Sequence, residues 1–183
     1  MMKATGRIII ALNNTVSGDK DNRLRAIWDQ YRKRLLYYIT GIMYCDKEDG
    51  EDILQEIMIK VYDNLDHYKT GTSFNAWIYA ITRNHCLDTL RKKRTRPRFE
   101  ELGERSGTAL DVFDDVCSKE LHRAIRASLE NLSDEDREMI YLRHFEGLRY
   151  KSIGNIIGMN VNSVKTRMRA AEARLRQDLK EWL

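Results

Sequence analysis

A single proline, Pro97, occurs among the 183 residues, and it separates two long stretches with helical periodicity. On both sides of it, apolar residues recur at steps of three and four, which is the spacing of one face of an α-helix. We find no strand-like alternation of useful length. Because proline disfavours helix at the residue before it, the pattern predicts an all-α chain with a boundary near Pro97.

The stretch before Pro97 predicts helices separated by short turns. The first is expected over about 24–44, and the next over about 51–65 after a break at Asp49-Gly50. A glycine turn at Gly71 then leads into a helix that Ser73 caps and that extends to about Arg94. These helices predict one small domain over residues 20–95.

The stretch after Pro97 predicts a helix-turn-helix. Helices are expected over about 119–129 and 134–145, where Ser133 with the acids after it is a start signal and Gly147 a stop. A short helix over 150–157, a turn at Gly158 and a final helix over 161–182 complete the motif. We therefore expect a second small domain over 119–183, joined to the first by a flexible linker over 96–118.

The composition excludes several classes of protein. With 33% charged residues and no apolar run near the ~20 residues that span a bilayer, the chain reads as cytoplasmic. The apolar run at 8–12 is too short for a signal peptide, and residues 1–19 match nothing we can assign. Three scattered cysteines and four scattered histidines predict no disulfide framework, no metal site and no cofactor.

The charge is unevenly distributed, although the net charge is only +4. Residues 83–98 hold seven Arg or Lys against one Asp, and residues 147–180 hold eight basic against two acidic residues. Between them, residues 99–120 hold seven acidic against two basic residues. Two basic blocks around an acidic middle favour two contacts with a polyanion, and the alternative is two solvated helix faces.

Residues 73–96 combine aromatic side chains at one end with a basic run at the other. Exposed aromatics stack on unpaired bases and cations hold phosphates, so this helix suits a strand of opened DNA. The alternative is that the aromatic end is core. We expect Phe74 and Ile81 to be core, whereas the sequence leaves Trp77 open between the two interpretations.

The final helix has a distinct inner and outer face. Val161, Val164, Met168, Ala171 and Leu175 step by three and four and are expected to face inward. The alternative is an ordinary helical hairpin with a solvated outer face. The short polar groups and cations near the start of the helix suit base edges and phosphates in a major groove. These are Asn162, Ser163, Lys165, Thr166 and Arg169, with Arg167 beside them.

Taken together, the motifs resemble a known family. The segments "EDILQEIMIKVYDNLDHY", "SFNAWIYAITRNHCLDTLRKKR" and "LENLSDEDREMIYLRHFEGLRYKSIGNIIGMNVNSVKTRMR" are similar, in order and spacing, to those of a bacterial sigma factor. The resemblance is to the small extracytoplasmic-function (ECF) type of the sigma-70 family, and it covers roughly 20–95 and 119–180. It implies a region 2-like domain before the linker and a region 4-like domain after it.

The resemblance also implies roles for individual residues. Asp52, Gln55 and Glu56, beside Met58 and Ile59, would bind the β′ clamp helices of core RNA polymerase; the alternative is a solvated helix edge. The loop residues Tyr68, Lys69, Thr70 and Ser73, with Trp77 and Asn84, would capture a flipped base of the −10 element. The sugar-phosphate backbone of the −10 element would be contacted by Arg91, Lys92, Lys93 and Arg94. The outer residues of the final helix would read the −35 element.

Some features fit the family less closely. Ala170 and Glu172 stand where basic residues are frequent, and Glu172 would repel phosphate if it faced DNA. Tyr62 stands where tryptophan is common. The acidic stretch 96–118 would occupy basic polymerase channels, or it is a plain tether.

As a whole, the resemblance implies a monomeric initiation factor without catalysis. Its partners would be core polymerase (β′ clamp helices and β flap), promoter DNA and an anti-sigma antagonist, often membrane-anchored. One alternative is a helix-turn-helix regulator that binds duplex DNA alone. Another is a phosphoryl-transfer enzyme that holds Mg²⁺ on Asp111, Asp114 and Asp115. The sequence has no glycine-rich phosphate loop near these acids, which counts against this alternative.

Overall fold

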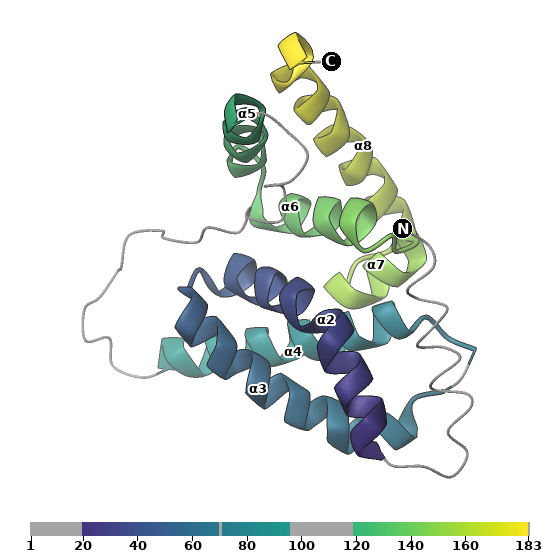
Figure 1. The fold of residues 1–183 in the computed structure, drawn as a ribbon. Helices are drawn as coiled ribbons and strands as arrows, with labels where there is room; N and C mark the ends of the chain where they lie inside the picture. The colour runs from purple at the N-terminus through teal and green to yellow at the C-terminus, as the bar shows by residue number, and fades with distance from the viewer. Residues whose placement is uncertain (1–19, 70, 96–118, 183) are drawn as a thin grey trace. The chain divides into compact units, whose positions relative to one another are not determined.

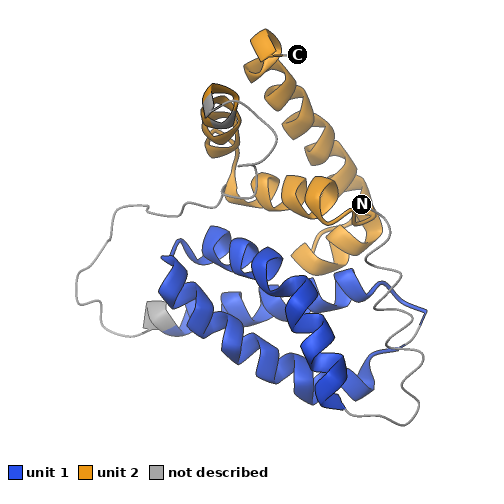
Figure 2. Ribbon diagram, in the orientation of Figure 1, with its two compact units in different colours: residues 1–107 blue, residues 108–183 orange. Residues whose placement is uncertain are grey.

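The computed structural model describes residues 20–69, 71–95 and 119–182, and every regular element within these ranges is helical. The chain divides into two compact units, residues 1–107 and residues 108–183 (Figure 2). Their boundary falls inside the stretch 96–118, which lies outside the described residues. The expected all-α, two-domain architecture is therefore confirmed.

In unit 1, helices α2 (Lys20–Met43), α3 (Lys47–Asn64) and α4 (Phe74–Thr95) all pack against one another (Figure 1). A 3₁₀ turn, η1 (Leu65–His67), ends α3. The apolar stripes predicted from the sequence meet in the middle, where the Tyr38 and Tyr79 rings pack edge to face at 4.9 Å. The fully buried side chains include Ile27, Tyr31, Leu35, Ile39, Leu54, Ile57, Leu65, Ile78 and Tyr79.

The predicted break at Asp49-Gly50 is wrong, because both residues lie inside α3. The chain turns earlier, and Asp46 caps the helix by accepting a hydrogen bond from the Asp49 N–H at 2.9 Å. Gly50 is buried instead: a Cβ atom there would lie 2.7 Å from Cγ2 of Thr40 and 3.0 Å from Cδ1 of Leu36. This glycine therefore allows α2 and α3 to approach closely rather than ending a helix.

Unit 2 contains α5 (Lys119–Glu130), α6 (Asp134–Ile140), α7 (Tyr150–Ile157) and α8 (Val161–Asp178). A π-helical turn, η3 (Tyr141–Phe145), continues α6, and a 3₁₀ turn, η4 (Lys180–Trp182), follows α8, so the last helix ends earlier than predicted. Helices α5, α6 and α7 each pack against α8. The core is formed by Leu132, Met139, Leu142, Leu148, Ile153, Val164 and Met168.

Local signals set the ends of these helices as the sequence predicted. The Ser133 side chain accepts from the Asp136 N–H, which starts α6, and Gly147 takes a φ of +64° beyond η3. Gly158 ends α7 at a φ of +74°, a conformation that costs glycine little. The structure adds Asn160, whose Oδ1 accepts from the Ser163 N–H at 2.8 Å and caps α8.

Candidate nucleic-acid and protein interfaces

The outer edge of α3 carries the predicted protein-binding cluster. Asp52, Gln55, Glu56 and Ile59 follow one another at steps of three, one and three, so they share one helix face, and all of them are exposed. Ile59 is 63% exposed, which is unusual for an isoleucine. Met58 is only 6% exposed, because its position turns it into the core. Met58 therefore lies beneath this edge, and its predicted contact with polymerase would require its side chain to be uncovered.

The loop before α4 is built around an aromatic cluster. The Tyr68 ring lies 5.2 Å from the Phe74 ring and 5.3 Å from the Trp77 ring, and its hydroxyl donates to the Thr72 carbonyl at 2.6 Å. Ser73 accepts from the Ala76 N–H at 3.2 Å, which confirms the predicted cap. Phe74 is buried as expected. Lys69 is exposed, and Thr70 lies outside the described residues.

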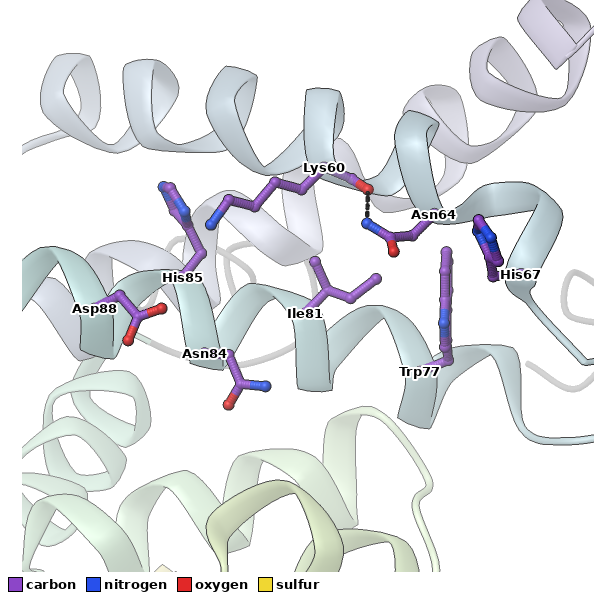
Figure 3. A pocket seen from close by; sticks show the side chains of 8 residues that line it. All are labelled: Lys60, Asn64, His67, Trp77, Ile81, Asn84, His85 and Asp88. Carbon is purple, nitrogen blue, oxygen red and sulfur yellow. Dashed lines mark hydrogen bonds between the residues drawn. The ribbon is translucent and has the colours of Figure 1, made fainter.

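A pocket lies between α4 and the C-terminal half of α3, with a volume of about 260 Å³. Trp77 and Asn84 both line it, so the structure brings together two residues that the sequence selected (Figure 3). Ile81 also lines the pocket and is half-buried, so the expectation that it is core is wrong. Trp77 is half-buried too. Its ring is therefore partly available to a ligand.

The opposite wall of the pocket was not predicted. It is formed by Lys60 and Asn64 of α3 and by His67 of η1, and the Asn64 side chain donates to the Lys60 carbonyl at 2.8 Å (Figure 3). The two α3 residues are four apart, so they stack on one side of the helix. That spacing was the available signal, but nothing in the sequence indicated that this side faces α4.

His85 and Asp88 complete the pocket. Burial lowers the pKa of His85, and the positive charges of Lys60 and Lys92 lower this pKa further, against the opposing effect of Glu56. His85 was missed in the sequence because it belongs to no cluster with ligand spacing. Its position directly after Asn84 was the only indication.

The basic end of α4 extends beyond the pocket. Arg91 and Lys92 are exposed, and Arg91 makes a surface ion pair with Asp88 at 3.3 Å. Lys93 and Arg94 belong to the helix, but their side chains lie outside the described residues. An exposed pair of this kind contributes little to stability, so it does not prevent Arg91 from turning to a phosphate.

The exposed face of α8 begins directly at its capped start. Asn162, Lys165, Thr166 and Arg169 are exposed, whereas Ser163 is half-buried beneath the cap. Val164, Met168 and Ala171 are buried, as the periodicity predicted, and Val161 and Leu175 are half-buried. The helix therefore offers hydrogen-bonding groups and cations on a convex surface, which is the form that reads a duplex major groove.

Arg167 is held inside unit 2. Its Nε donates to Oδ1 of Asp136 at 2.8 Å, Nη2 donates to the Ser133 hydroxyl at 3.2 Å, and Nη1 pairs with Glu135. Burial alone would raise the pKa of Asp136, but the hydrogen bonds from Arg167 and Ser133 outweigh it and lower that pKa. Hydrogen bonds to Asp136 and Glu135 raise the pKa of Arg167. These contacts of the Arg167 guanidinium, here called the Arg167 fork, therefore hold α8 against the start of α6.

Glu172 makes a contact inside unit 2. One of its carboxylate oxygens lies 2.9 Å from Nε2 of His144, in η3. This contact directs the Glu172 carboxylate toward η3. Ala170 is exposed and contributes neither charge nor a hydrogen bond from its side chain.

The described ranges hold neither a candidate metal site nor a helix suited to a membrane. No group of three or more His, Cys, Asp or Glu residues there is arranged to hold a metal ion. None of the helices described is long and apolar enough to cross a membrane. The acids Asp111, Asp114 and Asp115 of the alternative Mg²⁺ site lie outside those ranges.

Both units of the chain are similar to known proteins. Residues 27–96 match the family model for Sigma-70 region 2, and residues 122–175 match that for Sigma-70, region 4. The chain is 31% identical over 176 residues to the ECF RNA polymerase sigma factor SigW of Bacillus subtilis, covering 90% of this chain and 92% of that protein. It is 30% identical over 141 residues to the ECF RNA polymerase sigma-E factor of Escherichia coli, covering 71% and 74%.

Solved structures share the fold. CnrH in complex with the cytosolic domain of CnrY matches at a TM-score of 0.60 and 18% identity, covering 97% of this chain and 98% of that one. The sigma factor RpoE in complex with the anti-sigma factor NepR from Bartonella quintana matches at 0.55 and 22%, covering 84% and 96%. With both family regions matched in order, the chain belongs to the sigma-70 family as a promoter-directing RNA polymerase sigma factor of the ECF type.

Proposed function

We propose that the exposed edge of α3 is the surface that binds core RNA polymerase. Asp52, Gln55 and Glu56 would contact the β′ clamp helices, and Ile59 would be covered by the same partner. The charge and exposure of this edge support the assignment, because an exposed isoleucine beside acidic and amide groups suits a mixed protein interface. Unit 2 would contact the β flap, a role that rests on the family resemblance alone.

The −10 element is assigned to the pocket of unit 1 and to the loop beside it. A base flipped out of the duplex would enter near Tyr68–Ser73, with Trp77 as a stacking partner and Asn84 as a reader of the base edge. Arg91, Lys92, Lys93 and Arg94 would hold the adjoining phosphates. The observation that carries this proposal is the meeting of Trp77 and Asn84 in one pocket.

The −35 element is assigned to α8. Asn162, Lys165 and Thr166 would enter the major groove and Arg169 would contact a phosphate beside it, with Ser163 at the rim, while Arg167 would orient the helix from behind. The exposure of the first four residues and the capped start of α8 support this arrangement. Phosphate and base contacts of these types are the common ones in helix-turn-helix complexes.

The regulation of the protein is proposed from its relatives. We infer an anti-sigma partner, because the structurally similar RpoE was solved with the anti-sigma factor NepR. We place the protein in the cytoplasm as a monomer that assembles with core polymerase and catalyses no reaction of its own. The acidic stretch 96–118 would lie in the basic channels of the polymerase until RNA displaces it.

Run-off transcription tests this assignment. Purified protein is added to core polymerase from the same bacterium with sheared genomic DNA, and the 5′ ends of the transcripts are sequenced. We expect discrete new start sites that share two upstream elements. Absence of new starts, together with no complex with core on a sizing column, would favour a regulator that binds duplex DNA alone.

A further inference from the structure

His85 connects the two proposed surfaces of unit 1. It follows Asn84 on α4, but its imidazole turns inward and the residue is only 7% exposed. Its Nε2 lies 3.0 Å from Oε2 of Glu56, on the α3 edge assigned to polymerase. The approach is short but poorly aligned, since neither ring nitrogen makes a hydrogen bond of good geometry with the described residues.

The surroundings of the imidazole hold it in its neutral form at neutral pH. Burial lowers the pKa of His85, Lys60 from α3 and Lys92 from α4 lower it further, and Glu56 opposes them. His67 of η1 and Asp88 of α4 line the same pocket. A neutral imidazole binds a carboxylate weakly, whereas an imidazolium binds it through a charge-assisted hydrogen bond.

The Glu56 side chain lies at the surface beside His85. It is 66% exposed, and Oε2 is the carboxylate oxygen that contacts the imidazole. Asp52 and Ile59, on the same outer edge of α3, are exposed as well. A partner that binds this edge therefore competes with the imidazole for Glu56.

We propose that His85 is a positioning residue for Glu56: the protonated imidazole holds Glu56 against α4, whereas the neutral imidazole leaves it available to core polymerase at the α3 edge. This inference rests on the proposed polymerase-binding role of that edge. Linkage makes the competition reciprocal: protonation of His85 weakens polymerase binding, and polymerase binding disfavours protonation. Since His85 lies next to Asn84, this contact joins the polymerase surface to the −10 pocket.

The test measures the affinity of the fluorescently labelled full chain for core polymerase from about pH 8 down to about pH 5.5, where a histidine titrates. We expect the wild-type affinity to fall by up to about fivefold more than that of H85Q, the size typical of one partly exposed ion pair. The matched control is H144Q, which removes a His–Glu contact of 2.9 Å in unit 2 and should follow the wild type.

The E56Q variant separates failure of this inference from failure of the proposed surface. If E56Q binds core as well as the wild type at every pH, the polymerase assignment of Glu56 is wrong. If E56Q binds weakly but H85Q keeps the wild-type pH dependence, the surface stands and the coupling is overturned.

A second measurement does not depend on the folding of H85Q. NMR titration of the imidazole in the free protein should give a lower His85 pKa in E56Q than in the wild type, because Glu56 raises this pKa. Equal values in the two proteins would show that His85 does not hold Glu56, and would overturn the proposal.

Discussion

The pocket on α4 and the outer face of α8, the two regions proposed to bind DNA, have opposite shapes. The first is concave, with the half-buried Trp77 and Ile81 against a wall from α3. The second is convex, with Asn162, Lys165 and Thr166 exposed along a helix. An unpaired base needs a pocket that surrounds its ring, whereas paired bases present only their edges in a groove.

The two regions also differ in how the residues proposed to contact DNA are held. On α4 the aromatic cluster of Tyr68, Phe74 and Trp77 positions the pocket through ring contacts. On α8 the helix is fixed from behind by the ion pairs of Arg167 with Glu135 and Asp136. We therefore expect apolar truncations to impair the first region and charge changes to impair the second.

The largest effect is expected from Trp77→Ala. Loss of one stacked base costs about 1–3 kcal/mol, which corresponds to about 5- to 150-fold weaker binding of a single-stranded −10 oligonucleotide by the holoenzyme. The control is Trp28→Ala, since Trp28 is also half-buried in unit 1 but lies on α2, under Arg32. Equal losses for the two variants would mean that Trp77 is only part of the core.

Arg167 distinguishes positioning from phosphate contact. We expect Arg167→Ala to weaken duplex −35 binding about tenfold and to lower the free energy of unfolding of unit 2 by about 1–2 kcal/mol, allowing for its partial exposure. Arg167→Lys keeps the charge but cannot form the Arg167 fork. It should therefore restore little of the DNA binding and little of the stability of unit 2. If lysine restores DNA binding while stability stays low, Arg167 contacts phosphate directly.

Arg169 provides the matching test on the outer face. Arg169→Ala should weaken −35 binding about fivefold, almost equally for all sequences, and reduce the slope of log affinity against log salt by about one. The stability of unit 2 should not change, because Arg169 is exposed. Arg174→Ala, farther along the same helix, is the control. A sequence-dependent loss would instead make Arg169 a base-reading residue.

The smallest effect is expected on the stability of unit 2 at acidic pH. The pKa of Asp136 is lowered in the folded chain from the ordinary 3.8, so its contribution to stability is present above that value and is lost as the pH falls through the folded pKa. Denaturant unfolding of unit 2 should therefore show less loss of stability in acid for Asp136→Asn than for the wild type. Parallel curves would mean that the Arg167 fork does not depend on the Asp136 charge.

Features that depend on neighbouring residues were predicted well from the sequence. The helix expected over 150–157 is found at Tyr150–Ile157, and Ser133 caps α6 as expected. Each of these follows from a few adjacent side chains, because caps and glycine stops satisfy backbone groups locally. The same reasoning failed at Gly50, where a close approach of α2 required the glycine and no break occurs.

Features that depend on distant partners were not predictable. Arg167 was expected beside the DNA face as one of the −35 contacts, but its partner Asp136 lies 31 residues away, on another helix. The Lys60 and Asn64 wall of the pocket and the Glu56 contact of His85 also depend on how α3 packs against α4. A helical pattern shows which residues share a face, but not which helix that face meets.

The most direct test of the central claim uses the two promoter elements identified by run-off transcription. Holoenzyme containing Asn84→Ala or Arg169→Ala is titrated with the single-stranded −10 strand and, separately, with duplex −35 DNA. We predict that Asn84→Ala weakens only the first interaction and Arg169→Ala only the second. If either variant weakens both interactions equally, the two regions do not read different forms of DNA and the account is contradicted.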